Sequence, residues 1–77
     1  MTPTLRAEVR ALVSEHVALS EDDEAPLVLE SFVLVVLAED LEARFSIRVA
    51  AREVVPEHFG TLARLIAYVD RKQRETL

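Results

Sequence analysis

Ser31 is the side chain of this sequence whose type and position most suggest covalent chemistry. It stands at the start of a strongly apolar run, Phe32 to Ala38, which predicts a helix beginning near the serine. The free N–H groups and positive potential at a helix start favour a phosphodiester attached there. Serine is also among the best N-cap residues. The position therefore suits either a phosphodiester tether or a plain helix cap.

The other candidate side chains lack the spacing of a catalytic or metal site. His16 and His58 have no second histidine at the four-residue spacing of a zinc-protease helix. We expect His16 to be partly buried and hydrogen-bonded. The acidic run 21–24 lacks the alternating acids, glycine and distal glutamate of a calcium loop, which predicts a solvated loop. Three acids late in the central helix are expected to face solvent: Glu39, Asp40 and Glu42. We expect neither intrinsic catalysis nor a metal.

Composition limits the class of protein. The 77 residues, 51% of them hydrophobic, suffice for one small domain over 1–77 with a single core. With no cysteine, disulfide scaffolds and cysteine zinc sites are excluded. The net charge of −5 disfavours nucleic acid and favours a basic protein partner. The apolar run 27–38 is too short for a membrane span, and the N-terminus lacks a signal-peptide layout. We expect a soluble, cytoplasmic, free-standing monomer.

Hydrophobic periodicity predicts an all-α, four-helix bundle with three long helices and one short helix. The first helix is expected to be capped by Thr4 and to run to about Ala18, and the central helix to end near Phe45–Ser46. A short helix over 50–55 is expected to be stopped by Pro56, and a turn over 56–60 follows it. The last helix is expected to be capped by Thr61. The buried stripes are predicted to include Val9, Leu12, Val13, Leu34, Leu37, Ala38, Leu41, Phe45, Leu62, Leu65, Ile66 and Val69, with Phe59 filling the core from the turn and Tyr68 beside the last stripe.

The central motif resembles that of the acyl and peptidyl carrier proteins. Glu30-Ser31-Phe32 is similar to the family's Asp-Ser-Leu motif, and the helix after it is also similar. Two further runs resemble the family pattern: Phe45 followed by Ile47 and Val49, and Phe59-Gly60-Thr61-Leu62 at the entry to the last helix. The resemblance covers nearly the whole chain, including the first helix and the acidic loop.

The resemblance implies a bundle of the acyl-carrier type that carries 4′-phosphopantetheine on Ser31. The thiol of that arm would hold an acyl or aminoacyl group as a thioester. The implied partners are a phosphopantetheinyl transferase, a loading ligase, and downstream synthase or transferase enzymes. The implied partner surface comprises Glu30, Phe32, Val33, Val36, Glu39 and Asp40.

Three features depart from the family pattern. Glu30 replaces the aspartate, and Val28 replaces the glycine three residues before the serine. Val33 and Val36 are apolar where fatty-acid carriers are often polar or acidic, which favours a specialised polyketide, peptide or related pathway. The alternative is a helical interaction module that is never pantetheinylated and in which Ser31 is only a cap.

Overall fold

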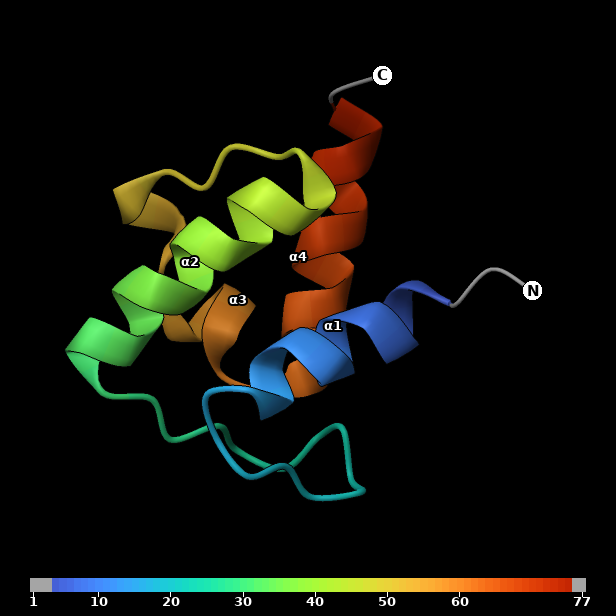
Figure 1. Cartoon of the computed structure of the whole chain (residues 1–77), viewed down its shortest axis with the longest axis vertical. Coiled ribbons are helices and arrows are strands. Elements are labelled where there is room, and N and C mark those ends of the chain that lie inside the picture. The colour runs from blue at the N-terminus through green and yellow to red at the C-terminus, as the bar shows by residue number, and fades with distance from the viewer. Residues whose placement is uncertain (1–3, 76–77) are drawn as a thin grey trace.

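The computed structural model describes residues 4–75, in which every named element is a helix. Figure 1 shows α4 upright, with α1 crossing its lower part and with α2 and α3 to its left. The long connection from α1 to α2 runs along the opposite edge from the C-terminus. The elements are α1 (Leu5–Ser14), α2 (Ser31–Phe45), the 3₁₀ helix η1 (Ala51–Glu53), α3 (Pro56–Phe59) and α4 (Leu62–Glu75). The predicted helix content, three long helices and a short one, is confirmed.

One hydrophobic core joins these helices, because α4 packs against α1, α2 and α3. The stripe of α2 that faces the core is fully buried at Leu37, Leu41 and Phe45. Leu34 and Ala38 lie at its edge and are only half-buried. The prediction that Phe59 fills the core is confirmed, whereas Tyr68 lies in the core itself. The buried set is Val9, Leu12, Val13, Leu37, Leu41, Phe45, Ile47, Phe59, Leu62, Leu65, Tyr68 and Val69.

Threonine hydroxyls cap two helices, as the sequence predicts. Thr4 Oγ1 accepts a hydrogen bond from Ala7 N at 3.1 Å, and Thr61 Oγ1 accepts one from Arg64 N at 3.1 Å. The predicted end of the first helix at Ala18 is wrong. α1 ends at Ser14, because the next backbone N–H groups donate to carbonyls three residues back and tighten the final turn.

Pro56 starts a helix, contrary to the prediction that it stops one. Proline suits the first helical position, because the N–H group that it lacks would have no hydrogen-bond partner within the helix. The expected short helix over 50–55 is reduced to the single 3₁₀ turn η1, and the expected turn over 56–60 contains α3. Gly60 follows α3 where a Cβ atom would lie 2.5 Å from the carbonyl oxygen of Pro56.

The acidic loop between α1 and α2 is tied to the bundle. Asp23 accepts hydrogen bonds from Arg6 Nε at 2.6 Å and from Arg10 Nη1 at 2.8 Å. The Arg6 hydrogen bond lowers the pKa of the Asp23 carboxyl. Farther along, Leu27 N donates to Gly60 O at 2.8 Å. The prediction of a loop is confirmed, but its acids are not all solvated, and these contacts fix the approach of the chain to α2.

No helix within residues 4–75 combines the length and the apolar character that crossing a membrane requires.

Ser46 ends α2 in the left-handed conformation, with φ 55° and ψ 46°. We expect Ser46→Gly to raise the free energy of unfolding by about 0.5–1 kcal/mol, because relief of the left-handed backbone outweighs the greater freedom of unfolded glycine. Urea denaturation measures the change. Ala43→Gly, at an exposed position within the same helix, is the control and should instead lower stability by about 0.5–1 kcal/mol. A destabilised Ser46→Gly variant would contradict the prediction.

Candidate functional site

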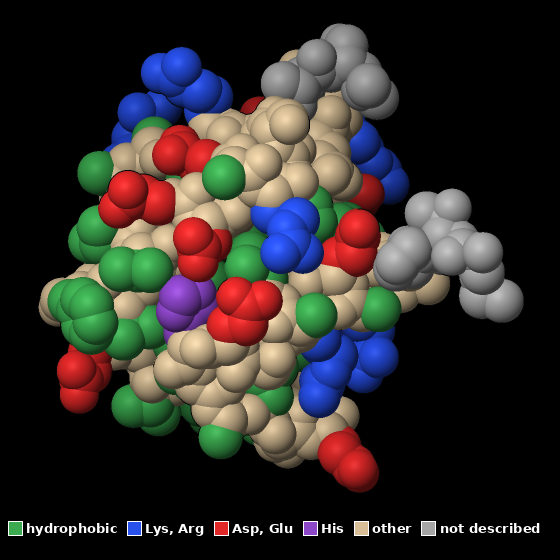
Figure 2. Space-filling model, in the orientation of Figure 1, with side chains coloured by type: hydrophobic (Ala, Val, Ile, Leu, Met, Phe, Trp, Pro, Cys, Tyr) green, Lys and Arg blue, Asp and Glu red, His purple; other side chains and the backbone are tan. Residues whose placement is uncertain are grey.

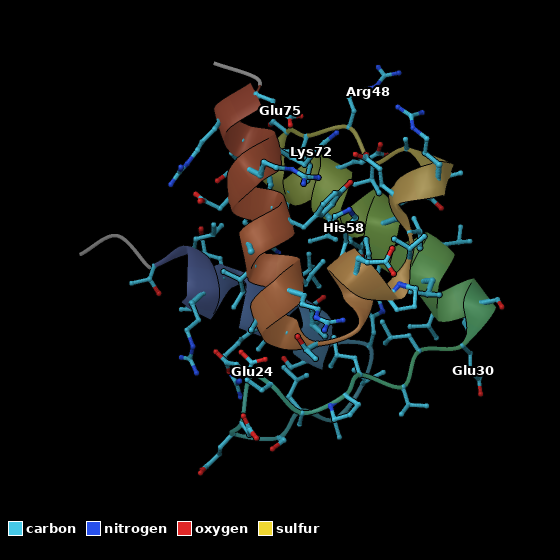
Figure 3. The ribbon with its side chains drawn as sticks, turned by 180° about the vertical axis from the view of Figure 1, so that it is seen from behind. Glu24, Glu30, Arg48, His58, Lys72 and Glu75 are labelled. Carbon is cyan, nitrogen blue, oxygen red and sulfur yellow. The ribbon has the colours of Figure 1, made fainter. Side chains whose placement is uncertain are left out.

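Ser31 is the first residue of α2, and its side chain is exposed. The N-cap is Glu30, whose extended backbone (φ −70°, ψ 155°) leads into the helix and whose carbonyl accepts a hydrogen bond from Leu34 N at 2.9 Å. Ser31 therefore lies one position inside the helix, and the alternative that it is a plain helix cap is wrong. The Glu30 side chain makes no capping hydrogen bond. In Figure 3 it extends away from the bundle at the tip of α2.

The Ser31 hydroxyl has no internal catalytic partner in the described part of the chain. No hydrogen bond or ion pair among residues 4–75 joins it to a histidine or a carboxylate. A serine hydroxyl is a weak nucleophile unless a base activates it. Within residues 4–75, no side chain is placed to activate this hydroxyl.

An open apolar groove of about 360 Å³ begins beside Ser31. Glu42, the last groove residue of α2, lies about 16 Å along the helix from the serine at 1.5 Å per residue. The walls and ends are formed by Ser31, Leu34, Val35, Ala38, Glu39 and Glu42 of α2, and by Val49, Ala51 and Val54 of the segment that faces them. The groove gives a group attached to Ser31 an apolar surface to lie against.

A smaller hollow of about 180 Å³ lies next to the groove. Leu34 and Val54 line both spaces and so form the partition between them. Its remaining lining is mostly apolar and comes from the connection before α2 and from α3 with its two flanking residues: Leu27, Leu29, Val55, Pro56, Phe59 and Gly60.

Three large apolar side chains are exposed near Ser31: Val28 at 86%, Phe32 at 69% and Val35 at 59%. Figure 2 shows hydrophobic side chains gathered at the left edge of the molecule, where Figure 1 shows the first turns of α2. Of the predicted partner-surface residues, the structure exposes Glu30, Phe32 and Glu39, and it leaves Val33 and Val36 half-buried. We call Val28, Phe32 and Val35 the apolar patch.

The sequence did not single out Val28 or Val35 as surface residues. Apolar side chains surround the first two turns of α2 almost completely, so the pattern alone does not reveal which of them face solvent. The signal that could have found Val35 is its helical angle, which lies well away from Leu37 and Leu41. Val28 precedes the helix and carries no such signal.

Two acids that were expected to face solvent have partners in the structure. Asp40 Oδ2 lies 2.8 Å from His16 Nε2, which joins α2 to α1 and confirms the prediction of a hydrogen-bonded His16. The Asp40 side chain remains 40% exposed. Glu42 Oε2 accepts a hydrogen bond from Val49 N at 2.8 Å. The prediction is therefore wrong for Glu42 and incomplete for Asp40, whereas Glu39 is exposed.

Glu53, which no sequence pattern marks, holds the segment that faces α2. One carboxylate oxygen accepts hydrogen bonds from Ala50 N at 3.1 Å, the Tyr68 hydroxyl at 3.0 Å and Lys72 Nζ at 3.1 Å. The Ala50 hydrogen bond, aided by Lys72 and Tyr68, lowers the Glu53 pKa to about 2. Burial raises the Tyr68 pKa above its usual range. No local sequence pattern predicts the Glu53–Tyr68 and Glu53–Lys72 hydrogen bonds, which join residues 15 and 19 positions apart.

His58 has a packing role in the structure. Its ring stacks on Tyr68 with 4.8 Å between centroids, and Figure 3 shows it within the bundle. Among residues 4–75, no group of three or more His, Cys, Asp or Glu side chains is arranged to hold a metal ion.

Comparison with known proteins adds no relative. No protein-family model matches the chain, and neither a curated protein nor a solved structure matches it.

Glu53 should make stability depend on acid pH. Its folded-state pKa of about 2 lies below the ordinary value of 4.5, so the unfolded chain takes up the proton first. The stabilisation is complete above about pH 4.5 and is lost as the pH falls towards 2. We expect Glu53→Gln to show a smaller loss of unfolding free energy across this range, measured by urea denaturation. Glu57→Gln, at an exposed acid of α3, is the control, and equal pH dependence in wild type and Glu53→Gln would contradict the prediction.

Proposed function

We propose that this protein is a carrier that holds an acyl or aminoacyl group as a thioester on a 4′-phosphopantetheine arm attached to Ser31. The observation that carries the proposal is an exposed hydroxyl at the start of α2 that opens onto an apolar groove. The hydroxyl lacks a base within residues 4–75, which suits a residue that a separate transferase modifies. The resemblance of Glu30-Ser31-Phe32 to the carrier motif supplies the identity of the arm.

The start of α2 is electrostatically suited to a phosphodiester. No acidic residue occupies the first turn, so its N–H groups and positive dipole end favour a phosphate, and the one neighbouring carboxylate is that of the N-cap Glu30, which makes no capping hydrogen bond. A phosphate there gains about 0.3–1 kcal/mol from the dipole. This gain favours the attached state but does not hold the arm, which remains free to move between partner enzymes.

The groove supports a role in receiving the arm or its cargo between reactions. The groove is open to solvent on one side. Its lining is mostly apolar, with carboxylates at Glu39 and Glu42. An open groove binds weakly, which suits a carrier that must release its cargo to each enzyme. Tethering raises the effective concentration of the cargo at a docked active site without tight binding.

The proposed partners are a phosphopantetheinyl transferase, a loading ligase and downstream synthase or transferase enzymes. Glu30 and Glu39 would speed encounter with basic surfaces, and the apolar patch would add a small desolvated contact. Val33 and Val36, from which the sequence favours a specialised polyketide, peptide or related pathway, are half-buried, so that part of the proposal depends on the exposed apolar patch instead. We propose that the carrier works as a monomer in the cytoplasm and leaves all catalysis to its partners.

Modification of Ser31 can be tested directly. We expect incubation with coenzyme A and a broad-specificity phosphopantetheinyl transferase to add one phosphopantetheine group, detected by intact-protein mass spectrometry. Ser31→Ala should abolish the addition, and Ser46→Ala, at another exposed serine beside the same helix, should retain it. Failure of the wild-type protein to gain the group, or an adduct that persists in Ser31→Ala, would contradict the proposal.

The same variant separates function from stability. Because Ser31 is not the N-cap, Ser31→Ala should change the free energy of unfolding by less than about 0.5 kcal/mol, the range typical of surface substitutions. Urea denaturation measures the change. A loss above about 1 kcal/mol would show that the serine supports the helix.

A second candidate is a helical interaction module that is never pantetheinylated. The apolar patch favours it, because Val28, Phe32 and Val35 expose large side chains that a partner could cover. This candidate predicts partner binding that survives Ser31→Ala and is lost in Phe32→Ser. The carrier proposal predicts instead that partner enzymes lose their substrate in Ser31→Ala.

A further inference from the structure

A pocket of about 300 Å³ lies against the connection between α1 and α2, which forms the lower edge of the molecule in Figure 1. Two stretches of the connection, within 17–22 and 25–28, form its walls, and Leu62 of α4 also lines it. No residue lines both this pocket and the groove beside Ser31. We call it the loop pocket, and its volume lies at the lower end of the range for small-ligand sites.

The fold holds the walls of the loop pocket in place. Asp23, between the two wall stretches, accepts a hydrogen bond from Ala63 N at its carbonyl oxygen at 2.9 Å, and its carboxylate binds Arg10 Nη1 at 2.8 Å. Farther along, Leu27 N donates to Gly60 O at 2.8 Å. These contacts tie the connection to α1, to α4 and to the residue that ends α3. The pocket is therefore shaped by the protein itself.

The interior of the loop pocket is apolar. Leu62 is only 2% exposed, and Val17, Leu19 and Leu27 are half-buried. Val28 also lines the pocket and is 86% exposed, which places it at the mouth. Val28 stands where the carrier pattern has glycine, so this part of the wall belongs to this chain. An aliphatic chain in the pocket would be shielded from water on several sides.

The polar side of the loop pocket is negatively charged. Asp22 lines it; Asp22 Oδ1 accepts a hydrogen bond from Glu24 N at 2.9 Å, whereas Oδ2 accepts none from residues 4–75. The four acids of the run 21–24 outnumber the two arginines bound to this run, Arg6 and Arg10, by two charges. An ammonium group donates hydrogen bonds and accepts none, so it complements this carboxylate.

We propose that the loop pocket binds a small aliphatic amine in its ammonium form, with the alkyl chain against Leu19, Leu27 and Leu62 and the charged end at Asp22. Burial of the chain supplies attraction, and the charge-assisted hydrogen bond selects a cation over an anion. A lysine side chain of a partner has the same chemistry, but a recess formed within one short connection suits a small molecule better than an extended protein surface does. The site does not rest on modification of Ser31.

A titration with two ligands of equal chain length tests the charge preference. We expect n-hexylammonium chloride, added to ¹⁵N-labelled protein, to shift the amide resonances of residues 17–22 and 25–28. Sodium hexanoate should bind about tenfold more weakly or less, because its carboxylate faces Asp22. Added sodium chloride should weaken the binding of hexylammonium, because it screens the partly exposed charge.

Variants test the pocket itself. Asp22→Asn keeps the acceptor for Glu24 N and should lower the affinity for hexylammonium about fivefold or more. Glu21→Gln removes the same charge from a residue that does not line the pocket, and should change the affinity less than about twofold. Val28→Ala removes part of the wall and should weaken binding about threefold. Its control is Val35→Ala, at an exposed valine outside the pocket, which should leave binding unchanged.

Several results would overturn the proposal: equal affinity for hexanoate, equal effects of Asp22→Asn and Glu21→Gln, or resonance shifts confined to the groove beside Ser31. Tighter binding of the peptide acetyl-Ala-Lys-Ala-amide than of hexylammonium would also overturn it, because the pocket would then receive a partner's lysine. Ser31→Ala should bind hexylammonium as the wild type does. Failure of the carrier proposal and failure of this one are therefore distinguishable.

Discussion

Burial of the inner stripe of α2 is the constraint on which the rest of the molecule depends. Leu37, Leu41 and Phe45 are fully or almost fully buried, and they fix both the rotation of α2 about its axis and its position along the core. Because a helix is rigid over its 15 residues, this burial also determines where its first residue lies. Ser31 is thereby presented at the surface by contacts made two to four turns away.

The same constraint explains why α2 has exposed apolar residues. One helix can bury only part of its circumference, and the first two turns of α2 are apolar on nearly every side. The side chains left over become the apolar patch at Phe32 and Val35 and the walls of the groove at Leu34 and Ala38. In a chain of 77 residues, exposing such side chains has a cost in solubility that a binding role would justify. The structure thus separates residues that hold the fold from residues that remain available to a partner.

Periodicity and capping chemistry predicted most of the fold, because both are local signals. The stripe of α2 and the caps at Thr4 and Thr61 follow from spacings of three or four residues. The errors arose where one local signal has two outcomes. Pro56 was expected to stop a helix but starts one, and Ser31 suits an N-cap but lies one position inside the helix.

The candidate site was predictable only at its centre. The motif around Ser31 identified the serine, whereas the groove is formed by two segments that meet through tertiary packing. Glu53 could not be found from sequence, because its partners Tyr68 and Lys72 lie 15 and 19 residues later in the chain, although they are in contact with it in space. The exposure of Val35 required knowledge of which side of an apolar helix is buried. Long-range pairing and helix rotation therefore limit what such a sequence reveals.

The central claim is that Ser31 carries an arm, and the state of the protein in the cells that make it tests this most directly. The protein should be isolated from those cells without added transferase, and its intact mass and that of the peptide containing Ser31 should be measured. The account predicts a mass increased by one 4′-phosphopantetheine group, with or without cargo, located on Ser31. A protein found entirely unmodified at Ser31 in growing cells would contradict it.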